Sequence, residues 1–88
     1  MDEGHFLYVL RSEQANRFYV GVSANPRLRL KRHNTTSTGF TARYRPWSLV
    51  YQHFFPTKQE ALAAERKAKA WKSKRMIQRL IAGEISPW

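Results

Sequence analysis

Hydrophobic residues fall into three short runs that predict β-strands. Residues 5–10 (HFLYVL) are apolar almost without interruption, which is typical of a strand buried on both faces. Residues 17–22 (RFYVGV) form a second run, and the short polar segment 12–16 before it predicts a β-hairpin. Residues 47–55 are rich in aromatic and β-branched side chains and predict a third strand.

A short helix is predicted between the second and third strands. Asn25 followed by Pro26 is typical of an N-cap and a first helical position, and the helix should continue to about His33. Residues 34–46 are rich in Thr, Ser and Gly, and they predict a loop.

Two helices are predicted after the third strand. Thr57 and Glu60 fit a capping box at the start of the first of them. Its buried face is marked by spacings of three and four residues, at Ala61, Ala64, Ala68 and Trp71. Ser73 is predicted to cap the last helix, which Gly83 ends. The apolar residues of that helix, expected to be buried, are Met76, Ile77, Leu80 and Ile81.

The predicted order is therefore β-β-α-β-α-α. This order predicts an α/β fold of the α+β type, with a small, three-stranded, mainly antiparallel sheet flanked by helices. A chain of 88 residues has room for one domain, so residues 1–88 are expected to form a single domain.

Charge adds the strongest functional signal. Sixteen Lys and Arg residues face six Asp and Glu residues, which gives a net charge of +10. Residues 26–59 and 66–83 contain no acidic residue, and each segment carries seven Lys or Arg residues. A polyanion relieves the repulsion among these charges, so nucleic acid is favoured over a merely solvated basic surface. An anionic membrane surface is a weaker alternative, because the basic helices also carry the core-facing residues.

Several classes of protein are disfavoured. The chain has no cysteine, which excludes disulfides, a thiolate nucleophile and cysteine-based zinc sites. The apolar runs are far shorter than a membrane span, and the N-terminus is acidic where a targeting peptide would be basic. We therefore expect a cytoplasmic protein with no membrane partner.

Glu65 is the acidic residue with the clearest chemical interest. It lies four residues after Ala61 and three before Ala68, so it borders the core-facing side of its helix. A carboxylate in that place needs either a cationic partner or a metal ion. Position alone favours an ion pair with a neighbouring Arg or Lys. The alternative is a ligand for Mg²⁺, which needs few protein ligands.

Other candidates are polar and aromatic residues near the predicted sheet. Arg29 and His33 share one face of the short helix and could clamp a phosphate or simply be solvated. Tyr8 and Tyr19 lie in adjacent strands, where a tyrosine is more often a core residue. Gly21 could mark a close approach or only a bulge. Exposed cations form the candidate nucleic-acid contacts: Arg27, Lys31, Arg32, Arg43, Arg45, Lys69 and Lys72. Phe40, Tyr44 and Trp47 could form an RNA-stacking platform, although anchoring the loop is their more common role.

The order of these residues resembles the GIY-YIG nuclease domain. The matching positions are Phe6-Leu7-Tyr8, Tyr19-Val20-Gly21, Arg29, His33 and Glu65. The likeness is greatest to small, stand-alone bacterial members that are related to the N-terminal domain of the excision-repair endonuclease UvrC. It extends from about His5 to Leu80. Phe6 and Leu7 depart from the Gly and Ile of the name-giving triplet.

The resemblance implies a metal-dependent endonuclease that hydrolyses DNA phosphodiester bonds, with a role in repair or recombination. Glu65 would hold Mg²⁺ or Mn²⁺, Tyr19 would help to activate water and Tyr8 would orient water or phosphate. Arg29 would stabilise charge on the phosphate, and His33 would assist proton transfer. The alternative is a non-catalytic nucleic-acid-binding module that retains this fold, and RNA is not excluded as its partner.

Overall fold

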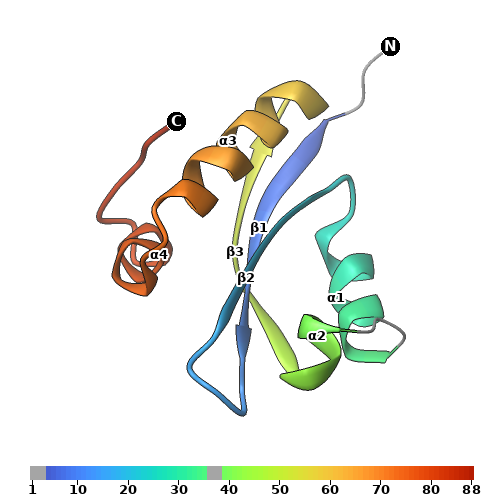
Figure 1. Ribbon diagram of the computed structural model, residues 1–88. Coiled ribbons are helices and arrows are strands. Elements are labelled where there is room, and N and C mark those ends of the chain that lie inside the picture. Colours follow the sequence, from blue (N-terminus) through green and yellow to red (C-terminus); the bar gives the residue numbers. More distant parts are fainter. Residues whose placement is uncertain (1–3, 36–38) are drawn as a thin grey trace.

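Three antiparallel strands form one sheet in the computed structural model, which describes residues 4–35 and 39–88 (Figure 1). The strands are β1 (His5–Ser12), β2 (Phe18–Ser23) and β3 (Trp47–Phe55), and their order in the sheet is β2-β1-β3. The central strand is therefore β1, whose four consecutive residues Leu7, Tyr8, Val9 and Leu10 are all buried. This burial confirms the prediction made from its continuous apolar run.

Helices cover both faces of the sheet. They are α1 (Pro26–Thr35), α2 (Phe40–Arg43), α3 (Lys58–Ala70) and α4 (Lys74–Ile81). Figure 1 shows α3 on one side of the sheet and α1 and α2 on the other. The predicted fold class, a three-stranded antiparallel sheet flanked by helices, is confirmed.

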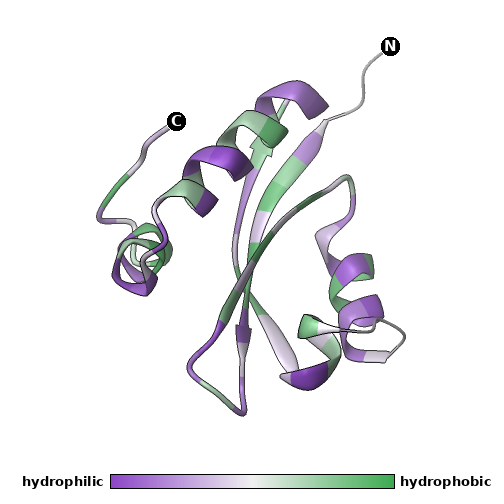
Figure 2. Cartoon of the chain, viewed as in Figure 1, coloured by the Kyte–Doolittle hydropathy of each residue, from purple (hydrophilic) through white to green (hydrophobic). Residues whose placement is uncertain are grey.

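The two faces of the sheet build two different cores. Leu7 and Val9 pack with the alanines of α3, whose small side chains let the helix approach the sheet closely. Successive side chains of a strand point to opposite faces, so their neighbours Tyr8 and Leu10 face the other way. Tyr8 and Leu10 pack with Trp47 on the face that α1 and α2 cover. Figure 2 shows the hydrophobic colour concentrated on the strands and on alternating parts of α3. Tyr8 is thereby directed toward α1.

Helix capping follows the sequence signals. The side chain of Thr57 accepts a hydrogen bond from the Glu60 backbone N–H (3.1 Å), and Ser73 accepts one from Met76 (3.2 Å). Asn25 does the same for Leu28 at the start of α1 (3.2 Å). These bonds satisfy N–H groups that have no partner within their own helices. Gly83, with a φ angle of 78°, follows the end of α4 as predicted.

One element was not predicted from the sequence. The segment 34–46, expected to be a loop, contains the single turn α2. Trp47 holds this turn against the sheet, because its indole Nε1 donates a hydrogen bond to the Thr41 carbonyl (2.7 Å). The ring of Phe40 also packs on Trp47. No helix among the described residues is long and apolar enough to span a membrane.

Candidate active site

The hydroxyl of Tyr8 lies directly against Gly21. The two residues are partners in the β1–β2 register. A Cβ atom placed on Gly21 would lie 2.6 Å from the Tyr8 hydroxyl oxygen and 3.0 Å from Cε2 of Tyr19. Any larger residue would therefore displace the tyrosines. The ladder between β1 and β2 runs without a register shift here, so Gly21 marks a close approach and not a bulge.

His33 meets Tyr8 from α1. The Tyr8 hydroxyl and His33 Nε2 are 3.1 Å apart in a buried hydrogen bond. The ring of His33 also packs on Tyr19, with 4.7 Å between the ring centroids. Burial lowers the pKa of His33 below its usual 6.5, and the positive charge of Arg29 lowers it further. His33 is therefore neutral at neutral pH, and its Nε2 accepts the proton of Tyr8 in the tautomer protonated at Nδ1.

Tyr8 experiences the charges of the other candidates. Burial raises its pKa above 10, and Tyr19 raises it further. A hydrogen bond with Arg29 and the positive charge of Arg29 lower the pKa, while the Glu65 carboxylate raises it. Tyr8 consequently remains a neutral phenol at neutral pH. Because these groups influence one hydroxyl, the five residues predicted from the family resemblance gather around one place.

Glu65 enters the site from α3. Its side chain is 21% exposed, and Oε2 lies 3.2 Å from Nζ of Lys69 one helical turn later. The ion pair expected from position alone is therefore present. Lys69 also lies over the ring of Tyr19, with Nζ 6.0 Å from the centroid. These contacts connect the acidic residue of α3 to the tyrosine on the edge strand β2.

The α1 helix is fixed to the sheet by a residue that sequence reasoning did not single out. The side chain of Asn34 accepts a hydrogen bond from the Trp47 backbone N–H (2.7 Å) and donates one to the Trp47 carbonyl (3.0 Å). This double contact holds the neighbouring His33 in place. An amide side chain at the end of a helix was a signal for such a contact, but its partner on β3 is visible only in the folded chain.

The predicted nucleic-acid contacts are spread over several elements. Exposed positions on α1 and α2 hold Arg27, Lys31, Arg32 and Arg43, and the exposed Lys69 and Lys72 lie on or just after α3. Arg45 is half-buried, and its Nε donates a hydrogen bond to the His33 carbonyl (2.9 Å). Arg45 thus contributes to holding α1, whereas the other cations extend toward solvent around the site.

The residues of the site fit a magnesium-type ion better than a zinc-type ion. No cluster of three or more His, Cys, Asp or Glu side chains that could hold a metal ion occurs in the described part of the chain. Glu65 supplies one carboxylate, whose charge raises the pKa of Tyr8. Mg²⁺ commonly binds through one or two carboxylates while water and substrate phosphate fill its other positions. Glu65 could hold such an ion, with Lys69 displaced from it.

Comparisons with known proteins find related sequences and a related structure. The model of the GIY-YIG catalytic domain matches residues 4–78. UPF0213 proteins from Staphylococcus aureus strains Mu3 and Mu50 are each 31% identical over 70 residues, which cover 78% of this chain and 84% of theirs. The solution NMR structure of the UPF0213 protein BH0048 from Bacillus halodurans superposes with a TM-score of 0.58 at 27% identity, covering 96% of this chain and 88% of that one.

The matched region contains the features from which the site is built. It includes both tyrosine motifs on β1 and β2, Arg29 and His33 on α1, and Glu65 on α3. Both the family model and the UPF0213 relatives cover most of the chain. The chain therefore belongs to the GIY-YIG family.

Proposed function

We propose that this protein is a divalent-metal-dependent endonuclease that hydrolyses phosphodiester bonds in DNA. Membership of the GIY-YIG family supports a nuclease-type function. The observation that carries the more specific proposal is the position of the Tyr8 hydroxyl. It bonds to the neutral imidazole of His33, and the charges of both Arg29 and Glu65 act on it.

Tyr8 acts as an orienting group. Since burial keeps its hydroxyl protonated, it is a hydrogen-bond donor and not a base at neutral pH. The close contact with Gly21 and the bond to His33 fix its direction. Because its one proton points at His33, the fixed hydroxyl oxygen can accept a hydrogen bond from water and so position that water without further reorganisation.

Proton transfer falls to Tyr19 and His33. Tyr19 helps to activate the attacking water, in agreement with its place in the second motif. His33 lies against its ring and is neutral at neutral pH, so its Nε2 can take up a proton that the bonded Tyr8 hydroxyl passes on. Arg29 stabilises the negative charge that develops on the phosphate, because a guanidinium group matches phosphate oxygens in two-point contact.

Glu65 is the residue that would hold the metal ion. Its pair with Lys69 is partly exposed, and such pairs contribute only about 0–1 kcal/mol, so a divalent cation can replace the ammonium group. When bound, Mg²⁺ or Mn²⁺ supplies Lewis-acid stabilisation of the phosphoryl oxygens. The displaced Lys69 is then available for a phosphate.

DNA is the proposed substrate, in repair or recombination. The net charge of +10 and the exposed cations of α1 and α2 favour a polyanionic substrate. The test is cleavage of end-labelled plain, nicked and branched DNA, and of RNA of the same sequence, with Mg²⁺, Mn²⁺ or EDTA. We expect DNA products with either metal and none with EDTA.

A matched pair of variants makes this test specific. Arg29→Gln should lose cleavage by about 10²-fold or more, as expected when a charge-stabilising donor is removed. Arg27→Gln removes an exposed cation of the same helix that is predicted to contact nucleic acid, so it should weaken binding but cut at nearly the wild-type rate once the DNA is saturated with enzyme. Tight, salt-sensitive binding without cleavage of any substrate would instead support a non-catalytic binding module.

A further inference from the structure

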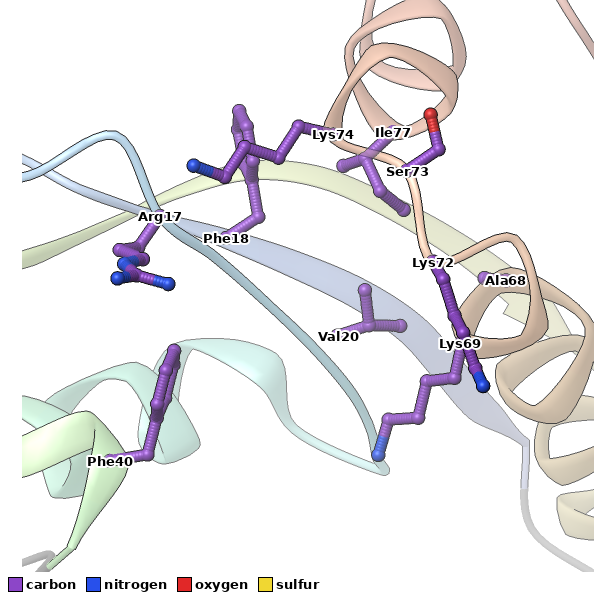
Figure 3. A pocket seen from close by; sticks show the side chains of 10 residues that line it. All are labelled: Arg17, Phe18, Val20, Phe40, Ala68, Lys69, Lys72, Ser73, Lys74 and Ile77. Carbon is purple, nitrogen blue, oxygen red and sulfur yellow. The ribbon is translucent and has the colours of Figure 1, made fainter.

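A hollow of about 230 Å³ lies beside the edge strand β2, between α2 and the turn that joins α3 to α4 (Figure 3). Its wall combines basic and aromatic side chains, including Arg17, Phe18, Phe40, Lys69, Lys72 and Lys74. None of the described residues that line it is acidic. Of the lining residues only Val20 belongs to a family motif, and none is one of the five site residues, so the hollow is a feature separate from the five-residue site.

The hollow is continuous with the candidate active site through Lys69. This residue lines the hollow, and its ammonium group also pairs with Glu65 and lies over the ring of Tyr19. Figure 3 shows its side chain extending from α3 to the end of the β2 strand. A nucleic-acid backbone that leaves the active site along β2 would therefore pass the cations that line the hollow.

Phe40 provides an apolar surface that is already held in place. Its side chain remains 46% exposed, although its ring packs on Tyr44 with 5.0 Å between centroids and on Trp47 with 5.9 Å. Arg17 lies over the ring of Tyr44, with its guanidinium carbon 5.1 Å from the ring centroid. Single-stranded nucleic acid commonly binds where its bases can stack on an exposed aromatic ring and its phosphates can contact nearby cations.

Lys72 occupies a backbone conformation that a lysine rarely adopts. Its φ angle is 48°, just after the end of α3, at a position where glycine is usual. Backbone strain of this kind is commonly found at functional positions. The residue held in this strained conformation, Lys72, is one of the cations that line the hollow.

We propose that this hollow is a groove that binds a single-stranded segment of DNA, continuing from the strand held at the active site. The proposal rests on the DNA endonuclease function proposed above and adds a preference for substrates with a single-stranded arm. The arm's phosphates contact Lys69, Lys72 and Lys74, and one base stacks on Phe40. The hollow is smaller than the roughly 300–1,000 Å³ of a drug-sized pocket, so it suits one nucleotide and not a duplex.

The test is a binding measurement that does not depend on cleavage. Fluorescence anisotropy in EDTA compares a blunt DNA duplex with the same duplex bearing a single-stranded DNA arm or an RNA arm. The proteins compared are wild type, Phe40→Ala, Lys72→Gly and the control Arg66→Ala, which removes an exposed charge of α3 outside the groove. Lys72→Gly should melt no lower than wild type, because glycine adopts a positive φ angle without strain.

The wild type should bind the DNA-armed duplex more tightly than the blunt one. Phe40→Ala and Lys72→Gly should each reduce that preference about fivefold or more, as expected when a stacking or phosphate contact is lost. Arg66→Ala should weaken both substrates equally and leave the preference intact. An equal loss on armed and blunt DNA in the groove variants, or a stronger preference for the RNA arm, would overturn the proposal. Arm preference in a protein that never cleaves would refute the nuclease function and leave the groove assignment standing.

Discussion

At the scale of single residues, the candidate site depends on how Tyr8 is held. Its hydroxyl is packed against the bare backbone of Gly21 on one strand and bonded to His33 on a helix. The two contacts come from different directions, so neither alone defines the position. A glycine in the middle of a strand weakens that strand. Here the missing side chain is what admits the tyrosine.

Gly21→Ala should therefore damage both stability and activity. The new Cβ would lie 2.6 Å from the Tyr8 hydroxyl oxygen, which forces a displacement. We expect the free energy of unfolding to fall by about 1–3 kcal/mol, as for other overpacked positions. Cleavage should fall by on the order of 10²-fold, because a displaced orienting group costs this much. Urea denaturation and a cleavage assay measure the two effects.

A double-mutant cycle identifies the cause of this loss. In a Tyr8→Ala background only the 3.0 Å contact with Cε2 of Tyr19 remains, so Gly21→Ala should then cost less stability than in the wild type. The same loss of stability in both backgrounds would show that the contact with Tyr8 is not the reason for glycine.

His33 should make stability depend on pH. Its folded-state pKa lies below 6.5, through burial and Arg29, so the unfolded chain binds a proton more readily. The free energy of unfolding should consequently fall as the pH drops from about 7.5 through 6.5 toward the lower folded pKa. Urea denaturation between about pH 7.5 and 5.5 compares wild type with His33→Gln, which cannot titrate.

The groups that face His33 remain in that comparison. They are Tyr8 and Tyr19 from the strands, Arg29 from its own helix and Arg45, whose Nε bonds to the His33 carbonyl. The variant should show a flatter pH dependence than the wild type. Parallel curves for the two proteins would contradict the assigned cause.

At the scale of elements, α3 serves both the core and the site. Its alanines pack on the sheet, while Glu65 at the border of that face reaches the tyrosines. The helix begins at a cap that lies about two turns before Glu65. Stability and activity should therefore respond differently to a change at that cap.

Thr57→Ala should destabilise the fold without altering the chemistry. The variant loses the hydrogen bond that the Thr57 side chain accepts from the Glu60 N–H, which costs about 0.5–2 kcal/mol. The melting temperature should fall by about 4–8 °C for each kcal/mol. Thr57→Ser retains the cap and should melt close to wild type. A cleavage rate per folded molecule that falls with Thr57→Ala would show that the cap and the site are coupled.

Most elements of this fold could be predicted from the sequence, because their signals are local. Thr57, Ser73 and Gly83 mark helix ends by side chains and backbone preferences that act within one turn. The α2 turn was missed because Trp47, outside the turn itself, holds it through the Thr41 carbonyl. Long-range contacts of this kind leave no periodic pattern.

The site could be predicted only in part, because some of its contacts are visible only in the folded chain. The family resemblance named Tyr8, Tyr19 and Glu65, and these residues do lie together. The contact between Tyr8 and Gly21 depends on the strand register, which the hairpin sequence does not define. The groove beside β2 depends on how the α3–α4 turn packs against the sheet, and it was not predicted. The assignment of the whole chain to one domain stays a prediction.

At the scale of the whole molecule, size and charge bear on the proposed binding of DNA. The longest extent of the molecule is 34 Å, similar to one helical turn of DNA, which is about 34 Å long. The molecule can therefore follow about one turn of duplex. A net charge of +10 on so small a surface makes association strongly dependent on salt.

Removal of one contacting cation should reduce that salt dependence. In Lys31→Gln, the plot of log affinity against log salt concentration for duplex DNA should become shallower by about 0.9, the value expected for one lost phosphate contact. Lys31 is exposed on α1, the helix that also carries Arg29 and His33. Arg75→Gln removes a charge from α4 and serves as the control, with an unchanged slope. A slope altered equally in both variants would indicate a diffuse charge effect.

The central claim is that Glu65 makes this fold a nuclease, and single-turnover cleavage tests it most directly. Glu65→Gln and the exposed Glu60→Gln on the same helix should be compared with wild type on one DNA substrate, with Mg²⁺ for cleavage and EDTA for binding. We predict that Glu65→Gln cuts at least about 10²-fold more slowly while binding as well or better, because catalytic charge stabilisation is lost and a repelling carboxylate is removed. Glu60→Gln should match wild type. Wild-type cleavage by Glu65→Gln would contradict the account.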